Sequence, residues 1–333
     1  MHTGRAFSLR ETIMWSRAHV IRGFLWSTFV CVLYGLGFTA LALPWLPTSA
    51  VAVAVAFYLG FKNNASYDRT WEARKIWGAI VNASRSWAYG ARDLIAAPEN
   101  EQAEADAVRK LLVVRHTAWL DALRHQLREV QSWEHRGERF DLIRKTNEAP
   151  EYGEKLPELL HGRLAETEVE DVLSQINPAA HLIARQSATL AEIRRKGWVD
   201  GFSHIHLQGL LDELMTQQGK SERIKKFPFP RQYATVNRIF AHLFCYLVPF
   251  GLLGELAGHG PYMFWMTIPF STLVGWVFLT MDQIGDWSEN PFEGLANDVP
   301  ISAMSRAIER DVLQIIGETE LPASRTFSGP LIY

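Results

Sequence analysis

Cysteine is nearly absent from this chain of 333 residues. The two cysteines, Cys31 and Cys245, are far apart and each lies inside an apolar stretch. A disulfide framework or a cysteine-based zinc site needs more cysteines at closer spacing. We therefore interpret both cysteines as small apolar core residues. We also expect no bound metal and no cofactor.

The chain also lacks an excess of charge of either sign. Lysine and arginine total 34, aspartate and glutamate total 36, and the formal net charge is −2. A protein that binds nucleic acid needs a basic surface that neutralises phosphates. We therefore expect no nucleic-acid partner.

The common catalytic signatures are missing as well. The sequence contains no helical HExxH pair, no GxSxG elbow and no GxGxxG loop. The segment Gly219-Lys-Ser221 resembles the end of a P-loop, but Leu214 stands where that motif requires a glycine. These absences predict that the chain is not an enzyme.

Uncharged residues, in contrast, are concentrated in two blocks, the first of which is 23–61. One helix needs about 20 apolar residues to cross a bilayer, so this block is long enough for two. Pro44 and Pro47 mark the break between them, because proline disrupts a helix interior. We expect one span at about Phe24–Leu43 and the next from about Thr48.

The second predicted span opens with a strand-like alternation, Val51-Ala-Val-Ala-Val-Ala-Phe57. A lone strand inside lipid leaves its backbone polar groups without partners, so we interpret the segment as helix.

The second uncharged block is 239–281, and Glu255 interrupts it. The part before Glu255 is short for a full span, so residues 233–237 are expected to complete it, with Arg238 facing protein or the interface. The fourth span is predicted at Tyr262–Met281.

Lysine and arginine are distributed unevenly around these spans. The hairpin loops at 44–49 and 255–261 contain neither residue. The flanks are basic: Arg17, Arg22, Lys62, Arg69, Arg74, Lys75, Arg223, Lys225, Lys226 and Arg231. The positive-inside rule therefore places both termini and the whole middle region in the cytoplasm.

The middle of the chain has the pattern of helices. Four leucines and a histidine recur at helical spacing over about 101–130 and predict one buried face: Leu112, His116, Leu120, Leu123 and Leu127. Residues 64–94 contain no proline, so the second membrane helix is expected to continue out of the membrane. Ile308, Val312 and Ile315 predict a further amphipathic helix that ends at Gly317.

Together these patterns predict an all-α integral membrane protein with four transmembrane helices and a large cytoplasmic helical bundle. The expected organisation is a cytoplasmic N-terminal segment (1–22), helices 1 and 2 (23–61), a cytoplasmic helical region (62–232), helices 3 and 4 (233–281) and a cytoplasmic C-terminal segment (282–333).

Two histidines, His204 and His206, are a candidate site in the middle region. Side chains at i and i+2 of a helix point to different sides, so a shared metal is a poor fit without a third ligand. We favour ordinary polar histidines over a metal site.

Val53, Phe57 and Phe61 form one stripe along the second span, at i, i+4 and i+8. From spacing alone, lipid contact or helix packing is the favoured interpretation. The alternative is a hydrophobic constriction, since apolar rings around an oligomer axis gate ions by dewetting. Asn64 follows, as suits a pore lining that becomes polar.

Three motifs along the chain form a recognisable set. The first is Phe57-Tyr-Leu-Gly-Phe61 with Asn63-Asn-Ala-Ser-Tyr-Asp-Arg-Thr-Trp-Glu-Ala-Arg74. The second is Glu289-Asn-Pro-Phe292 after the last span, and the third is Leu207-Gln-Gly-Leu-Leu-Asp-Glu213 before the third span. Together these motifs resemble the bestrophin family, most closely its bacterial branch, and they occur in that family's order from the second span to beyond the fourth.

The resemblance implies a homopentamer with one pore on its five-fold axis. The family's hydrophobic neck residues match Val53, Phe57 and Phe61, and its cytoplasmic aperture matches Ile205. Asn64, His204 and His206 then become pore-adjacent residues.

The sequence departs from the family pattern in two places. Animal bestrophins carry a calcium-binding acidic run after Asn-Pro-Phe, but Glu293-Gly-Leu-Ala-Asn-Asp298 has only two carboxylates. Calcium needs six to eight oxygen ligands, so we do not expect calcium activation. The first neck residue is Val53, where isoleucine is usual in the family.

The resemblance predicts a channel for small monovalent ions in a bacterial inner membrane, with the homopentamer, lipid and the permeant ions as its partners. The family label is chloride channel, whereas cation conduction occurs in the bacterial branch, so the sign of the ion stays open. Alternatives are a transporter of small organic anions or other solutes, and a membrane-anchored binding or scaffold protein. Protonation of His204 and His206 is expected to reduce a cation current.

Overall fold

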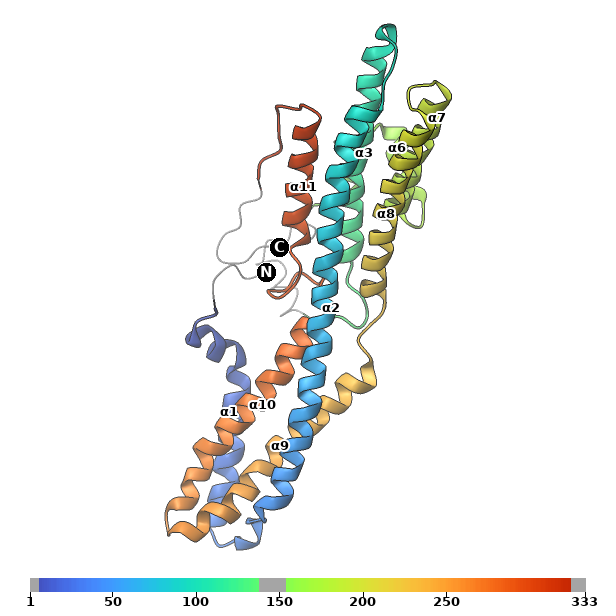
Figure 1. Ribbon diagram of the computed structural model, residues 1–333. Helices are drawn as coiled ribbons and strands as arrows, with labels where there is room; N and C mark the ends of the chain where they lie inside the picture. The colour runs from blue at the N-terminus through green and yellow to red at the C-terminus, as the bar shows by residue number, and fades with distance from the viewer. Residues whose placement is uncertain (1–5, 138–153, 325–333) are drawn as a thin grey trace. The chain divides into compact units, whose positions relative to one another are not determined.

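The computed structural model describes residues 6–137 and 154–324 of the chain. Helices are its regular elements, and no strand occurs within these ranges, which confirms the predicted all-α class (Figure 1). The outer ends of the predicted terminal segments, 1–5 and 325–333, lie outside the described residues, as does 138–153 of the predicted cytoplasmic region.

The chain divides into two compact units. One, here called the span unit, comprises Gly4–Arg69 and Pro228–Glu289. The other, here called the polar unit, comprises the described residues of Thr70–Phe227 and Asn290–Tyr333. Four helices, all beginning in the span unit, are long and apolar enough to cross a membrane, in agreement with the four predicted spans.

The first membrane helix, α1, runs from Leu9 to Gly35 and so begins and ends earlier than the predicted span Phe24–Leu43. A capping box fixes its start: Glu11 N donates to Ser8 Oγ at 3.2 Å, and Ser8 N donates to the Glu11 carboxylate at 2.7 Å. Gly37, with φ of 105°, terminates it in a conformation that favours glycine. Hydropathy located the apolar part, but the helix also includes the charged turns before it.

The second helix, α2, runs without interruption from Trp45 to Leu94. It confirms that the Val51–Phe57 alternation is helical and that the helix continues through 64–94 (Figure 1). Pro47 is tolerated because it lies in the first turn, where backbone N–H groups have no intrahelical partner.

The third and fourth membrane helices are α9 (Arg231–Leu256) and α10 (Thr267–Ser288). Helix α9 includes the expected extension through 233–237. Helix α10 begins later than the predicted Tyr262, because a short 3-10 turn at Met263–Met266 precedes it.

Close helix packing holds the span unit together. At Gly23 of α1, a Cβ atom would lie 3.6 Å from Thr272 Cα of α10. Near the end of α9, a Cβ on Gly254 would lie 2.1 Å from the Leu43 carbonyl oxygen, so only glycine fits there. The main core of this unit is apolar and comprises Val55, Leu59, Ala241, Phe244, Val248 and Leu279.

The polar unit contains the rest of α2 and six further described helices. They are α3 (Gln102–Arg128), α5 (Leu156–His161), α6 (Glu166–Ser174), α7 (Pro178–Arg195), α8 (Gly201–Lys226) and α11 (Ile301–Ile315). The predicted face of α3 is confirmed, since Leu112, His116, Leu120, Leu123 and Leu127 are all buried. Four fully buried tryptophans, Trp77, Trp87, Trp119 and Trp198, fill the core.

The predicted C-terminal amphipathic helix is α11. Ile308 and Val312 are buried on its inner face, as the spacing indicated. Gly317, with φ of 89°, follows its last turn.

Candidate functional site

The candidate pore residues of α2 lie on an exposed apolar stripe. Val53 is 71%, Phe57 65% and Phe61 49% exposed in a single copy of the chain. The rings of Phe57 and Phe61 meet edge to face, with their centroids 4.6 Å apart. The structure therefore brings these three predicted residues together on one surface of α2, as helical spacing indicated.

The opposite face of α2 is buried. Val55, Leu59, Lys62 and Ser66 recur at helical spacing and are each 2% exposed or less. Because this face is fixed against the rest of the span unit, the stripe with Phe57 and Phe61 has to face outward.

Lys62 is the strongest anchor on that buried face. Its Nζ donates to Asp282 Oδ1 and to Asp286 Oδ1, both at 2.6 Å, and both acceptors belong to α10. Arg238 of α9 donates to the second oxygen of Asp286. Two cations and two carboxylates thus form a neutral network that joins α2, α9 and α10.

The structure gives two of these charged residues, Lys62 and Arg238, more specific roles than the sequence predicted. Lys62 was counted among the basic flanks of the membrane, but it is fully buried and ion-paired. Arg238 was expected to face protein or the interface, and its pairing with Asp286 confirms contact with protein. The other basic residues of the flanks therefore remain as the positive charges that favour a cytoplasmic side.

The stripe becomes polar along α2. Asn64 is exposed, and Asp68, four residues later, is exposed too. Among the residues that the structure describes, Asp68 has no ion-pair or hydrogen-bonding partner. Sequence reasoning missed Asp68, although its spacing of i+4 from Asn64 and i+7 from Phe61 places it on the same side of a helix.

The predicted aperture residue lies in the polar unit, in the first turns of α8. Ile205 is 69% exposed and Phe202, three residues earlier, is 89% exposed. The flanking histidines differ, since His204 is half-buried and His206 is exposed.

A negative charge precedes this turn of α8. Asp200 caps the helix by accepting hydrogen bonds from Phe202 N at 2.8 Å and Ser203 N at 3.1 Å. The hydrogen bonds from Ser203, first of all from its hydroxyl, hold the pKa of Asp200 below its usual range, so this exposed carboxylate stays charged.

The segment that matches the family's calcium-binding region already has internal partners. The Glu293 carboxylate accepts from Asn290 Nδ2 at 2.7 Å and lies 2.8 Å from His135 Nδ1. Asp298 Oδ2 accepts from the backbone N–H groups of Gly294 and Leu295 at 2.6 and 3.0 Å. These buried carboxylates bind donors of the chain itself, so they do not fit a calcium cage.

Burial also disfavours the charged form of Asp298. It raises the pKa of this carboxyl group to about 7, although Arg128, 3.8 Å away, acts in the opposite direction. In the described parts of the chain, no three His, Cys, Asp or Glu side chains are placed to hold a metal ion.

The fold and this site define a class: helical membrane proteins with four spans and one long helix that extends beyond its apolar part. The chain belongs to the bacterial/fungal bestrophin family, whose model matches residues 5–314. This membership confirms the resemblance, and with it the prediction that the chain is not an enzyme.

Several relatives carry a functional name. A voltage-dependent anion channel-forming protein of Ralstonia nicotianae is 32% identical over 284 residues, which cover 84% of this chain and 81% of that protein. The voltage-dependent anion channel-forming protein YneE of Escherichia coli K12 is 30% identical over 277 residues, covering 83% and 78%.

A solved structure has the same fold. The crystal structure of a bacterial bestrophin homologue from Klebsiella pneumoniae matches with a TM-score of 0.76 at 26% identity, over 91% of this chain and 98% of that one.

Proposed function

We propose that the chain forms an ion channel in which several copies surround one pore, five copies by the family resemblance. The observation that carries this proposal is the outward stripe of Val53, Phe57 and Phe61 on α2, opposite the face anchored by Lys62. In a ring of copies these side chains form stacked apolar rings, which gate ions by dewetting.

The polar continuation of the stripe favours a pore over lipid contact. A lipid-facing stripe should stay apolar as long as it remains in the membrane, and a charged side chain is costly there. Asn64 and Asp68 instead follow Phe61 on the same side of α2, as in a lining that opens into water.

The second constriction is assigned to Ile205 at the start of α8. Its exposure, and that of Phe202, leaves an apolar turn free to line an aperture. His204 and His206 flank it, so their protonation adds positive charge beside the ion path. The basic flanks of the spans support a cytoplasmic location for both termini and this region in a bacterial inner membrane.

We propose that the pore conducts small monovalent ions and that it prefers cations. Asp68 supplies the preference, because each copy adds one carboxylate below the apolar rings. The names of the relatives point to anions instead. The reversal potential in asymmetric NaCl distinguishes the two signs.

Recording from the purified protein in planar lipid bilayers tests the proposal. We expect a conductance that Phe57→Ala and Ile205→Ala each increase, because smaller side chains lower the dewetting barrier. Leu25→Ala is the matched control, since Leu25 is 61% exposed on α1, away from the stripe. A folded protein without conductance would refute the channel, and saturable flux of organic anions would favour a transporter.

A further inference from the structure

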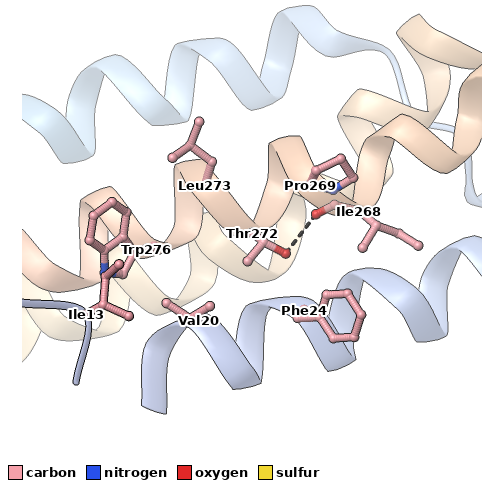
Figure 2. A pocket seen from close by; sticks show the side chains of 8 residues that line it. All are labelled: Ile13, Val20, Phe24, Ile268, Pro269, Thr272, Leu273 and Trp276. Carbon is pink, nitrogen blue, oxygen red and sulfur yellow. Dashed lines mark hydrogen bonds between the residues drawn. The ribbon is translucent and has the colours of Figure 1, made fainter. Parts of the chain in front are cut away.

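A groove on the outside of the span unit has no role in the proposed pore. It is an open groove between α1 and α10 with a volume of about 410 Å³. Ile13, Val20 and Phe24 line it from α1, and Ile268, Leu273 and Trp276 line it from α10 (Figure 2). The single hydroxyl in the lining, on Thr272, donates to the Ile268 carbonyl at 2.7 Å. The groove thus offers an apolar wall and no free polar partner.

The length of the groove fits one leaflet of a bilayer. Ile13 and Phe24 are three helical turns apart, which at 1.5 Å per residue is roughly 16 Å. The hydrocarbon core of a bilayer is about 30 Å thick, so half of it has nearly the same length. An extended acyl chain is the membrane component with this shape and polarity.

Tryptophans mark the Ile13 end of the groove as the end near the headgroups. Trp276 lies beside Ile13 (Figure 2), and its indole N–H donates to Ser16 Oγ at 2.7 Å. Trp15 and Trp287 meet edge to face at the same ends of α1 and α10, with a centroid distance of 5.3 Å. Tryptophan is enriched at the membrane–water interface.

Two arginines share this face of α1 near that end. Arg17 stands between the lining residues Ile13 and Val20, four residues after the first and three before the second, and Arg10 stands three before Ile13. Both side chains are exposed, and within the described part of the chain neither has a carboxylate partner. Arg22 differs, because it is engaged by the Ala18 carbonyl and His19.

We propose that this groove binds one acyl chain of an anionic phospholipid whose phosphate pairs with Arg17 and Arg10. Guanidinium groups pair with phosphate in a bidentate way, and each basic residue near a membrane surface adds substantially to the attraction of anionic lipid. The apolar groove alone accepts any acyl chain, whereas the two arginines select the headgroup charge. This assignment does not depend on the channel proposal.

Native mass spectrometry of the full-length protein in micelles with added phosphatidylglycerol or phosphatidylcholine tests the site. We expect a preference for phosphatidylglycerol that falls roughly 30-fold in the Arg10→Gln/Arg17→Gln double variant. Arg22→Gln, which removes one positive charge from another face of α1, should keep the preference, and either single variant, Arg10→Gln or Arg17→Gln, should lower it.

A second variant tests the groove without changing charge. Val20→Trp should fill the groove and weaken binding of both lipids, whereas Leu25→Trp, on the exposed side of α1, should not. An unchanged preference in the double arginine variant would overturn the proposal, and so would unchanged lipid binding in Val20→Trp. Loss of the oligomer in Val20→Trp would also overturn it, because another copy would then cover the groove.

Discussion

At the scale of one residue, a substitution of Asp68 tests the charge selectivity of the proposed pore. We expect Asp68→Asn to lower the ratio of cation to anion permeability at least fivefold, because one unit charge a few ångströms from an ion in water contributes about 1 kcal/mol and every copy in the ring loses one. The reversal potential in asymmetric NaCl measures this change. Glu104→Gln removes an equal charge from α3 and should have no effect, and a wild-type channel that passes chloride would contradict the role given to Asp68.

The burial of His116 predicts that the stability of the folded chain depends on pH. It is fully buried in the polar unit, and neither ring nitrogen has a hydrogen-bond partner among the described residues. Burial lowers its pKa to about 3 from a usual value of 6.5. The unfolded chain therefore binds a proton below about pH 6.5 while the folded chain does not, so the stability present above pH 6.5 is lost as the pH falls towards 3.

Through His116, the free energy of unfolding falls by about 2 kcal/mol between about pH 7.5 and 5. We expect His116→Leu to remove this part of the pH dependence, which unfolding of the protein in micelles at a series of pH values measures. His181→Leu is a suitable control, because its ring is exposed in the folded chain. Equal pH dependence in wild type and His116→Leu would show that the histidine is not kept neutral by burial.

At the scale of helices, the ion network of Lys62 holds α2 in its rotational position. We expect Lys62→Met to lower the free energy of unfolding by about 3–5 kcal/mol, because it leaves the Asp282 carboxylate buried without its cation. The double variant Lys62→Met/Asp282→Leu should recover most of this loss, since Asp286 keeps Arg238. Unfolding in guanidinium measures both, and no recovery would argue against the pairing as the cause.

The same network shows how far the sequence determines these elements. Periodicity and hydropathy predicted α3, α11 and the long α2, because each depends on neighbours within a few turns. The partner of Lys62 is 220 residues away in α10, so no local pattern could reveal it. The helix starts were also harder to predict, since Ser8 and Glu11 begin α1 well ahead of the uncharged block.

The candidate site was predictable to a similar degree. The stripe of Val53, Phe57 and Phe61 follows from helical spacing, and the structure adds that the stripe is exposed because Lys62 anchors the other side. The assignment of Ile205 came from the family resemblance and not from spacing, and it stays a prediction. The groove between α1 and α10 required the structure, since it depends on which helices pack together.

At the scale of the whole molecule, one copy of the chain cannot enclose the proposed pore. Val53, Phe57 and Phe61 lie on the outside of the span unit, so a lining needs further copies around an axis. The family resemblance implies a closed ring of identical subunits, which cyclic symmetry allows. Native mass spectrometry should therefore give a mass of five chains, and a monomer as the largest species would exclude this pore.

Mixed rings provide a sharper test, because they connect subunit number to the stripe. If Phe57 of every copy faces one pore, wild-type and Phe57→Ala chains expressed together should assemble into rings of every composition. Each substituted copy widens the same constriction, so single-channel recordings should show a ladder of conductances with one level more than the number of subunits. Mixtures of wild-type and Leu25→Ala chains should show one level. If the Phe57 mixture showed only the two conductance levels of the parental channels, each chain would conduct alone. The proposal of a shared pore would then be wrong.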